Sequence, residues 1–426
     1  MAWGRVPKRS GSGSCSNEKR RIKKHKVIYV IKTGVGMSEE KDAFRAGSEA
    51  AGKALAEAGG KADLAVVFAT SKYDQQKLMD GLVKALGNTP MCGGTTAGEI
   101  SNTGFSEGSV VVMALKSGKV RFATGLGKGI PQGEAKAGRE LVENAMKKAK
   151  GMKGAKALVM FNDSMAGDGL EVIKGAQSVL GEDFEIVGGA LGDDAAFKET
   201  WQYYDGRVYQ GTVTGFMVFG SIHSTTGVMS GWTSMGNRMK ATAAKGNVLL
   251  ELDGKPALDV YASMLGPERA KKLPAIGLEY PFGLIDDKAV IKGKEYFQLR
   301  CPLAVDWAKK SVTLAASVPI GKEVTLTIAS REDVIEGAKL SAAQAKAGIG
   351  KRKPAAIFMF SCVARKMVLG ERVGEEISAV RRALGPGVPI IGFYTYGEIG
   401  PIDKTVDELK QTKWHNETVV LWVLAE

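Results

Sequence analysis

The fold is decided by residues 65–100, which read AVVFATSKYDQQKLMDGLVKALGNTPMCGGTTAGEI. An apolar run opens the stretch, and a polar loop leads from it into a segment with Leu78, Leu82 and Leu86 at helical spacing. The stretch closes on a second short segment and a glycine-bounded loop that ends in Glu99. This order predicts a strand, an amphipathic helix and a second strand, with the glycine-bounded loop beyond the end of that strand.

The same order of segments returns twice. ALVMF at 157–161 leads to GGALGDD at 188–194, and AIFMF at 356–360 leads to GFYTYGE at 392–398. A glycine just past a helix can close it without a steric penalty, and the three helical segments end alike, at Leu86-Gly87, Leu180-Gly181 and Leu384-Gly385. The sequence therefore predicts an α/β fold of mixed sheets with flanking helices, built from three diverged strand-loop-helix-strand repeats.

The segments between the repeats give further expectations. A first strand is predicted over 26–33, followed by a helix that starts at Ser38 and ends at Ala58. Two strands over 110–115 and 119–124 are predicted to form a hairpin. The glycines of 125–129 are predicted to form a turn, because they lack the full spacing and the acidic partner of a dinucleotide-binding loop.

A length of 426 residues predicts two domains. We place them at 27–240, with two repeats, and 241–426, with the third. Residues 1–26 contain nine Lys or Arg and one Glu, so they carry most of the net charge of +13 and are expected to form a disordered basic tail. The body is nearly balanced in charge, and no apolar run is long enough to span a bilayer. Neither nucleic-acid binding nor membrane insertion is expected.

Polar residues gather just beyond the predicted strands, at the sheet edge where α/β proteins usually bind ligands. A carboxylate that recurs after the glycine loops is expected to belong to the fold, whereas Asp163, Asp168 and Arg365 are better candidates for specificity. An amino-acid-like ligand would need a cation such as Arg365 to clamp its carboxylate and an acid to meet its ammonium group. The predicted ligand-binding residues are Thr95, Thr96, Asn162, Asp163, Ser164, Asp168, Asp193, Asp194, Ser361, Cys362, Arg365, Tyr394, Tyr396 and Glu398.

Catalytic and metal chemistry have less support. The four cysteines are far apart and form no metal-binding pair, and no phosphate-binding loop occurs. A hydrolase would need to pair Ser164 or Cys362 with His223 or His415, a pairing that the sequence does not establish. We therefore expect no enzymatic activity and no metal.

The chain resembles the FIST family of microbial sensory domains. The resemblance rests on ADLAVVFATSKYD, CGGTTAGEI, FNDSMAGDG and GGALGDD, then on LELDGKPALDVYASMLG, FSCVARKMVLG, GFYTYGEIGP and HNETVV, which follow in order along nearly the whole chain after the tail. It implies a cytoplasmic sensor that binds small ligands, amino acids having been proposed. Because no kinase, cyclase or methyl-accepting segment follows Val423, it is expected to signal in trans through a partner such as a histidine kinase.

Some members of this family are nitric-oxide-sensing haem proteins that regulate histidine kinases. The resemblance therefore implies an alternative in which non-covalent haem b is held by an axial ligand, either His415 or His223. Our leading prediction is a sensor without a cofactor.

Overall fold

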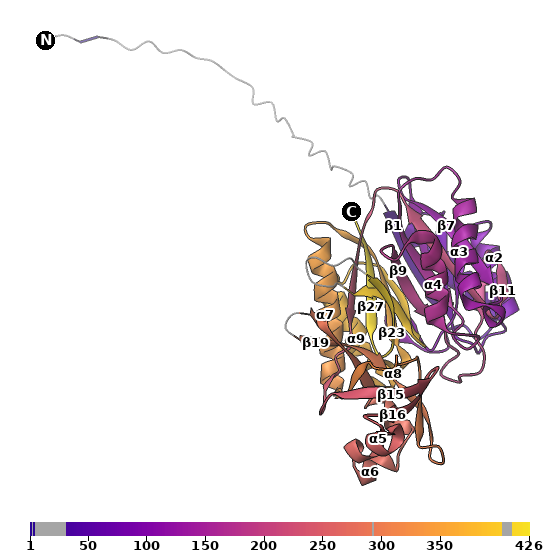
Figure 1. Ribbon diagram of the computed structural model, residues 1–426. Coiled ribbons are helices and arrows are strands. Elements are labelled where there is room, and N and C mark those ends of the chain that lie inside the picture. Colours follow the sequence, from indigo (N-terminus) through magenta and orange to yellow (C-terminus); the bar gives the residue numbers. More distant parts are fainter. Residues whose placement is uncertain (2, 5–30, 292–293, 403–410) are drawn as a thin grey trace.

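The computed structural model describes residues 1, 3–4, 31–291, 294–402 and 411–426, without the side chains of 286–296. Within these residues the chain forms three six-stranded mixed sheets with flanking helices and one nine-stranded antiparallel sheet (Figure 1). Most of the predicted basic tail lies outside the described residues. In the described part of the chain, no helix is long and apolar enough to cross a membrane. The predicted α/β class with mixed sheets is confirmed.

The first sheet contains one parallel pair, β2 with β3, among antiparallel neighbours. Alanines of α1 (Ala43–Ala58) and leucines of α2 (Gln75–Leu86) pack on its outer face. The strands, in spatial order, are β1 (Ile31–Ser38), β6 (Val110–Ser117), β2 (Leu64–Ala69), β3 (Met91–Thr95), β10 (Gln202–Tyr204) and β11 (Arg207–Tyr209).

The second sheet repeats this plan, with β8 and β9 as its parallel pair. The outer face is covered by α3 (Glu134–Lys148) and α4 (Gly169–Leu180). The strands, in spatial order, are β26 (Gln411–His415), β25 (Glu398–Ile402), β9 (Glu185–Ala190), β8 (Ala155–Asn162), β12 (Thr212–Phe219) and β7 (Arg121–Lys128).

The third sheet has β23 and β24 as its parallel pair. Its outer face is covered by α7 (Arg331–Ile349) and α9 (Val373–Leu384), and the short α8 (Val363–Leu369) follows β23 directly. The strands, in spatial order, are β13 (His223–Met229), β27 (Val419–Ala425), β23 (Pro354–Cys362), β24 (Ile390–Thr395), β4 (Glu99–Ser101) and β5 (Gly104–Ser106).

The nine-stranded sheet is inserted between β13 and α7 and has its own core with α5 (Ala257–Leu265). Its main path is β19 (Lys294–Arg300), β18 (Phe282–Ile291), β22 (Glu323–Ile328), β15 (Met239–Lys245), β16 (Val248–Leu252), β21 (Ser311–Leu314) and β20 (Pro302–Asp306), with β14 (Thr233–Ser234) beside β22 and β17 (Lys255–Pro256) beside β16. Its strands β15 and β16, with α5 and α6 (Pro267–Ala270), extend from one end of the body formed by the other three sheets, whereas β19 lies beside α7 (Figure 1).

The inner faces of the three six-stranded sheets share one apolar core. Phe68 on β2, Phe161 on β8 and Phe360 on β23 meet there. The ring centroids are 5.1 Å apart for Phe68 and Phe161 and 6.0 Å apart for Phe161 and Phe360. Aromatic side chains bury large apolar areas, so this contact holds the three sheets together at their centre.

Each six-stranded sheet receives a strand pair from another part of the chain. The pair β4–β5 follows β3 in sequence but joins β24, and β10–β11 follows β9 but joins β3. The pair β25–β26 follows β24 but joins β9. The three sheets are therefore linked in a closed cycle by main-chain hydrogen bonds. Descent of the three similar segments from internal repeats stays a prediction.

The predicted helix ends are confirmed. The helices α2, α4 and α9 end at Leu86, Leu180 and Leu384. The glycines that follow have φ values of 59°, 89° and 117°, a region that glycine enters without steric cost. The predicted start of the first helix at Ser38 is wrong, because Asp42 caps α1 by accepting a hydrogen bond from the N–H of Arg45.

The predicted hairpin over 110–124 is also wrong. Its two strands, β6 and β7, belong to different sheets, since β6 pairs with β1 and β2 whereas β7 pairs with β12. Both strands are buried on both faces apart from their ends. Local sequence predicted the strands correctly, but partner choice depends on the shared core, which a short window does not contain.

Glycines that were predicted to form loops lie inside strands instead. A Cβ on Gly36 of β1 would lie 2.0 Å from the carbonyl oxygen of Ala50 in α1, and a Cβ on Gly127 of β7 would lie 1.8 Å from that of Ala137 in α3. The glycines therefore allow a helix backbone to approach the strand closely. This close packing explains why the first strand runs to Ser38 and why Gly125 and Gly127 lie in β7, whereas Gly129, with a φ of 74°, follows the strand.

Candidate functional site

Two adjacent cavities form what we call the junction cleft, between the body and the nine-stranded sheet. The larger, of about 540 Å³, is lined by Ser164, Met165, Gly167, Asp168, Gly169, Phe197, Gly246, Asn247, Leu303, Ala315, Ala316, Ser317, Tyr396 and Trp414. The smaller, of about 250 Å³, is lined by Phe197, Pro274, Ala275, Leu278, Cys301, Pro302, Leu303, Ala315, Cys362, Val363, Ala364, Met367, Tyr396 and Asn416.

Exposed apolar side chains gather around this cleft. Met165, Phe197, Leu303 and Met367 are between 42% and 51% exposed, although each is a large apolar residue. Such side chains are normally scattered singly over a surface, and a group of them around a concavity marks a binding site. All four line the junction cleft.

The shared wall of the two cavities is a stacked pair of rings. The ring centroids of Phe197 and Tyr396 lie 4.4 Å apart, and the angle between the ring planes is 16°. The hydroxyl of Tyr396 donates to Oδ1 of Asp193, and burial raises the pKa of the phenol above its ordinary value. Sequence reasoning predicted that Tyr396 contacts the ligand. In the structure its ring lines the cavity wall, and its hydroxyl is bonded to Asp193.

The loop that carries Phe197 is held in an unusual conformation. The carboxylate of Asp193 accepts hydrogen bonds from the N–H groups of Phe197, Lys198 and Glu199, at 2.8, 2.7 and 3.0 Å. Asp194, Ala195 and Phe197 have φ values between 53° and 64°, which non-glycine residues seldom adopt. Backbone strain of this kind concentrates at functional sites. Asp193 therefore holds the loop that forms the cavity wall.

Trp414 forms the floor of the larger cavity and depends on two glycines. A Cβ on Gly169 would lie 2.0 Å from the indole ring, and a Cβ on Gly397 would lie 2.1 Å from it. Asp168, directly before Gly169, is exposed and caps α4 by accepting from the N–H of Leu170 at 2.9 Å. Its carboxylate lies at the rim, and Ser164 lines the same cavity.

The smaller cavity has two thiols and an amide in its wall. Burial raises the pKa of Cys301 and of Cys362 well above the ordinary thiol value, so both stay protonated. Asn416 is 2% exposed, and its Oδ1 has no hydrogen-bond partner among the described residues. Sequence reasoning missed Asn416, whose only signal was its place in a short polar segment between two strands.

Two buried glutamates lie in equivalent surroundings. Glu99 accepts from the Thr96 hydroxyl at 2.5 Å and from the Ser109 N–H and hydroxyl at 3.2 and 2.7 Å. Glu398 accepts from the Thr395 hydroxyl and from the N–H and hydroxyl of Thr418, the last two at 3.0 and 2.8 Å. Burial raises the pKa of each carboxyl to about 7. Both glutamates therefore have a structural role, because their carboxyl groups bond to neighbouring loops inside the protein.

In the second sheet the corresponding contacts are made by an amide. The sequence suggested that Asp193 or Asp194 would supply the carboxylate there. Instead, Oε1 of Gln202 accepts from the N–H and hydroxyl of Thr212 at 3.2 and 3.1 Å. The amide nitrogen of Gln202 donates to the Thr200 hydroxyl at 2.9 Å. The expected third carboxylate is thus a glutamine eight residues after Asp194.

Arg365 does not reach the cleft. Its side chain is fully buried and forms an ion pair with Glu376, at 2.7 Å from Nε to Oε1. Its remaining nitrogens donate to the carbonyls of Ser230 and Val334. The hydroxyls of Tyr394 and Ser361 donate to the same glutamate, at 2.9 and about 3.1 Å. The predicted carboxylate clamp is instead the centre of a buried network within the third sheet and its helices.

The other predicted residues are also engaged within the fold. Thr95 accepts from the N–H of Trp201 at 3.0 Å, and Asp163 accepts from the N–H groups of Met165 and Gly211 at 3.0 and 3.1 Å. Asp194 accepts from Thr70 and Ser71. Asn162 is the exception: it is fully buried, and neither polar atom of its side chain has a hydrogen-bond partner among the described residues. Of the predicted ligand-binding residues, the structure brings Ser164, Asp168, Cys362 and Tyr396 together at the cleft.

Both histidines proposed as axial haem ligands bond a backbone carbonyl. Nε2 of His415 donates to the Gly400 carbonyl at 2.9 Å, and burial lowers the pKa of the ring to about 4. Because neighbouring strand residues face opposite sides, His415 points away from the cavity that Trp414 lines. His223 bonds the Gly348 carbonyl and pairs with Ala425 at one end of the third sheet.

The distance from His223 to Cys362 also excludes their cooperation as base and nucleophile. Ala425 pairs with Pro354, and β23 then runs from Pro354 to Cys362, about 26 Å at 3.3 Å per residue. A protonated Cys362 thiol is, moreover, a weak nucleophile. Among the described residues, no group of three or more His, Cys, Asp or Glu is placed to hold a metal ion.

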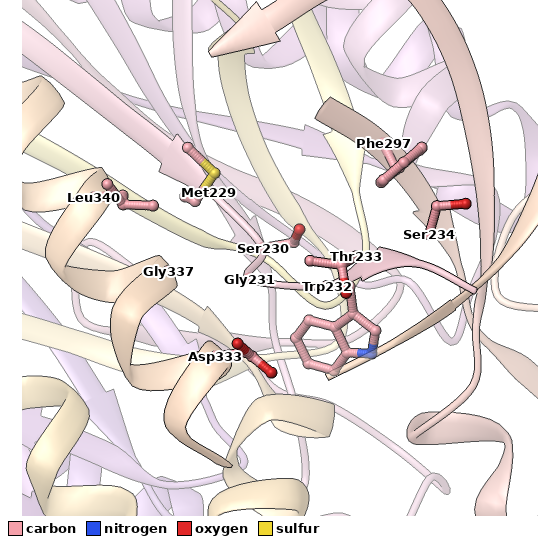
Figure 2. A pocket seen from close by; sticks show the side chains of 10 residues that line it. All are labelled: Met229, Ser230, Gly231, Trp232, Thr233, Ser234, Phe297, Asp333, Gly337 and Leu340. Carbon is pink, nitrogen blue, oxygen red and sulfur yellow. The ribbon is translucent and has the colours of Figure 1, made fainter. Parts of the chain in front are cut away.

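A separate cavity of about 210 Å³ lies where β13 leads into the nine-stranded sheet, and Figure 2 shows its lining. Trp232 and Phe297 lie on one side of it and Leu340 of α7 on the other (Figure 2). The carboxylate of Asp333 is engaged in capping α7, since it accepts from the N–H and hydroxyl of Ser330 at 2.9 and 2.7 Å. None of the predicted site residues lines this cavity.

Comparison with curated proteins gives relatives of unassigned function. An uncharacterised protein of Mycobacterium tuberculosis is 25% identical over 221 residues, which cover 51% of this chain and 56% of the relative. An uncharacterised protein of Methanocaldococcus jannaschii is 35% identical over 94 residues, or 20% of this chain and 17% of that protein. The chain thus spans about half the length of the mycobacterial relatives it matches.

Likeness to solved structures is weak. A chorismatase has a TM-score of 0.34 at 9% identity, with 94% of this chain and 100% of that chain covered. A cyanuric acid hydrolase from A. caulinodans has a TM-score of 0.27 at 11% identity, with 45% of this chain and 70% of that chain covered. Neither similarity is high enough to support an argument on activity.

Family comparison gives the clearest result. The FIST N domain matches residues 63–255, and the FIST C domain matches residues 257–401. The two matches follow each other and together cover most of the sequence, so the chain belongs to the FIST family of sensory domains.

Proposed function

We propose that this protein is a cytoplasmic sensor that binds a small metabolite in the junction cleft and reports its occupancy to a partner protein in trans, such as a histidine kinase. Amino acids and related metabolites are the first candidates for the ligand. We also propose that the protein does not turn its ligand over. The gathering of exposed apolar side chains around the cleft is the observation that carries this proposal.

The place of the cleft suggests how binding becomes a signal. One wall comes from the body, through residues such as Tyr396, and the other from the nine-stranded sheet, through residues such as Leu303 of β20. Most of that sheet packs on its own apolar core, whereas Ile285, Phe297 and Leu299 join the core of the third sheet. A ligand held between the two walls favours the arrangement in which both contact it. The partner would read that arrangement.

A metabolite screen with a blocked variant tests the proposal. Ala315, which follows β21, lines both cavities, so Ala315→Trp should fill the cleft, whereas Ala304→Trp places the same side chain on an exposed residue of the neighbouring strand β20. Thermal-shift measurements should identify a ligand that raises the Tm of the wild type and of Ala304→Trp but not of Ala315→Trp. A ligand that stabilises all three proteins equally would show that it binds elsewhere.

The absence of turnover is tested in the same screen. Each ligand that stabilises the protein should be recovered unchanged after long incubation with it, as checked by mass spectrometry. Conversion of the ligand would show that the protein is an enzyme.

A further inference from the structure

We infer that the larger cavity of the junction cleft takes an organic amine, whose ammonium group meets the carboxylate of Asp168 and whose apolar body meets the aromatic wall. This inference rests on the proposed function and names the chemical class of the ligand. It separates amines from the free amino acids to which they are related, because the described lining of the cleft offers no cation to a ligand carboxylate.

The charge of the cleft is negative. Among the described residues that line its two cavities, Asp168 is the only one with a charged side chain, and it lines the larger cavity. The cation that the sequence suggested, Arg365, lies in a separate buried network. A ligand carboxylate would lose hydration in the cleft without gaining a counter-ion, which costs free energy. The cleft therefore disfavours anions and free amino acids.

Asp168 has a carboxylate oxygen that is available to a ligand. The residue is exposed at the rim of the cavity, and its Oδ1 accepts from the N–H of Leu170 at 2.9 Å. Its Oδ2 has no hydrogen-bond partner among the described residues. An ammonium group that reaches Oδ2 gains a charge-assisted hydrogen bond, which is stronger than a bond between neutral groups.

The N-terminus of α4 does not turn this cavity into an anion site. Helix N-termini bind anions through the free N–H groups of their first turn. Here the N–H of Leu170 donates to the side chain of Asp168, and the N–H groups of Glu171 and Val172 donate to its carbonyl at 3.1 and 3.2 Å. Asp168 thus occupies the place of an anionic ligand, and its charge repels a second anion.

Aromatic rings supply the second contact for a cation. Tyr396 covers one face of Phe197, which is nevertheless 46% exposed, so the rest of that ring is open to a ligand in the cleft. The indole of Trp414 forms the floor of the same cavity. Cations are attracted to the faces of aromatic rings, most strongly to that of tryptophan. Met165 and Leu303 offer apolar contacts to the body of the ligand.

Four probes that share a phenethyl body separate the possible ligand classes. Phenethylamine is a cation at pH 7, phenethyl alcohol is neutral, hydrocinnamate is an anion and phenylalanine carries both charges. We expect the full-length protein to bind the amine about tenfold more tightly than the alcohol, the effect of one hydrogen bond to a charged group. Hydrocinnamate and phenylalanine should bind more weakly than the alcohol. Ligand-observed NMR titrations measure all four.

The variant Asp168→Asn tests the assigned residue. Asparagine caps a helix as well as aspartate does, so α4 is retained while the charge is removed. The affinity for phenethylamine should fall about tenfold, to that for the alcohol, and alcohol binding should not change. Asp168→Ser, which also keeps a capping side chain, serves the same test if the asparagine variant does not fold.

A matched control removes the same charge from another helix. Asp74 caps α2 by accepting from the N–H of Lys77 at 3.1 Å and is not part of the lining of either cavity. Asp74→Asn should bind phenethylamine as the wild type does. Ala315→Trp should lose the binding, because its side chain fills the cleft.

Several outcomes would overturn the inference. These are equal affinities for the amine and the alcohol, tighter binding of hydrocinnamate or phenylalanine than of the amine, and absence of amine binding at millimolar concentration. Unchanged amine binding in Asp168→Asn, or an equal loss in Asp74→Asn, would also overturn it. The proposed function would survive all of these if a metabolite still stabilised the wild type and not Ala315→Trp. It would fail if no metabolite did so, whatever the probes show.

Discussion

At the scale of single residues, the same buried position is occupied by Glu99, Glu398 and Gln202. Each accepts from the N–H and hydroxyl of a later Ser or Thr. The glutamine shows that a neutral amide meets the requirements of this position. The two glutamates therefore add a pH-sensitive group to contacts that do not require a charge.

The glutamates should make stability depend on pH. The folded-state pKa of Glu398 is raised from 4.5 to about 7 by burial, so the folded protein binds the proton more tightly than the unfolded chain. The resulting stability is fully present below about pH 4.5 and is lost as the pH rises through 7, on the order of 3 kcal/mol for this carboxyl. Urea unfolding between pH 4.5 and 8 measures it.

The variant Glu398→Gln should lose this contribution. Its free energy of unfolding should fall less than that of the wild type as the pH rises, so that the variant is the more stable protein at pH 8. Glu143→Gln changes an exposed glutamate of α3 and should follow the wild-type profile. A wild-type profile in Glu398→Gln would show that the group is not the source of the pH dependence.

Arg365 shows the limit of residue-level prediction. A single arginine beyond a strand fits an anion clamp, and the partner that engages it, Glu376, lies eleven residues later on another helix. Nothing in the local sequence joins the two. Phe197 was missed for the same reason, because its place in the cleft depends on the ring of Tyr396, which is distant in sequence.

Removal of the arginine should therefore affect stability. Breaking a buried ion pair leaves an uncompensated charge, so Arg365→Ala should lower the free energy of unfolding by about 3–5 kcal/mol. The exposed Arg45, which pairs with Glu40 at 3.1 Å, gives a control whose loss should cost less than about 1 kcal/mol. Urea unfolding at pH 7 compares the two variants. Equal effects would contradict the structural role of Arg365.

At the scale of elements, strand and helix positions were largely readable from the sequence. Apolar runs and helical spacing predicted the strands that form the parallel pairs and the helices that connect them, and the Leu-Gly pairs predicted where α2, α4 and α9 end. Partner choice was not readable. The strands β6 and β7 follow each other closely but enter different sheets, because the shared core and not the connecting turn determines their neighbours.

The contact between β7 and α3 should be sensitive to one methyl group. In Gly127→Ala the new Cβ would lie 1.8 Å from the carbonyl oxygen of Ala137, so helix and strand must separate. We expect a loss of about 1–3 kcal/mol of stability, typical of overpacking. Gly118 has no heavy atom within 4 Å of its added Cβ, and Gly118→Ala should change stability by less than about 1 kcal/mol. Thermal unfolding of the two variants decides this, and a tolerant Gly127→Ala would contradict the close packing.

At the scale of the whole molecule, exchange of strand pairs joins the three sheets into one body. A fragment that ends at residue 240 would lack β24, which pairs with β4, and β25, which pairs with β9. The predicted domain boundary at that residue stays a prediction, but the cut would expose unpaired strand edges and part of the shared core. The two FIST matches therefore describe parts of an interlocked fold.

Residues 31–240 alone should not reproduce the folded body. We expect the fragment to lack the cooperative thermal transition of the full-length chain and to expose apolar surface that binds a hydrophobic dye, because β4, β9, β13 and β14 lose neighbours. Circular dichroism and dye fluorescence measure this. A sharp, dye-free transition in the fragment would show that the exchanged strands are dispensable.

The central claim is that the ligand binds between the body and the nine-stranded sheet. Hydrogen exchange of the full-length protein, with and without a ligand from the screen, tests it most directly. The account predicts slower exchange at both walls, in residues 193–199 and 301–317, and unchanged exchange around the cavity of Figure 2. Protection confined to the Figure 2 cavity, or to one wall alone, would contradict it.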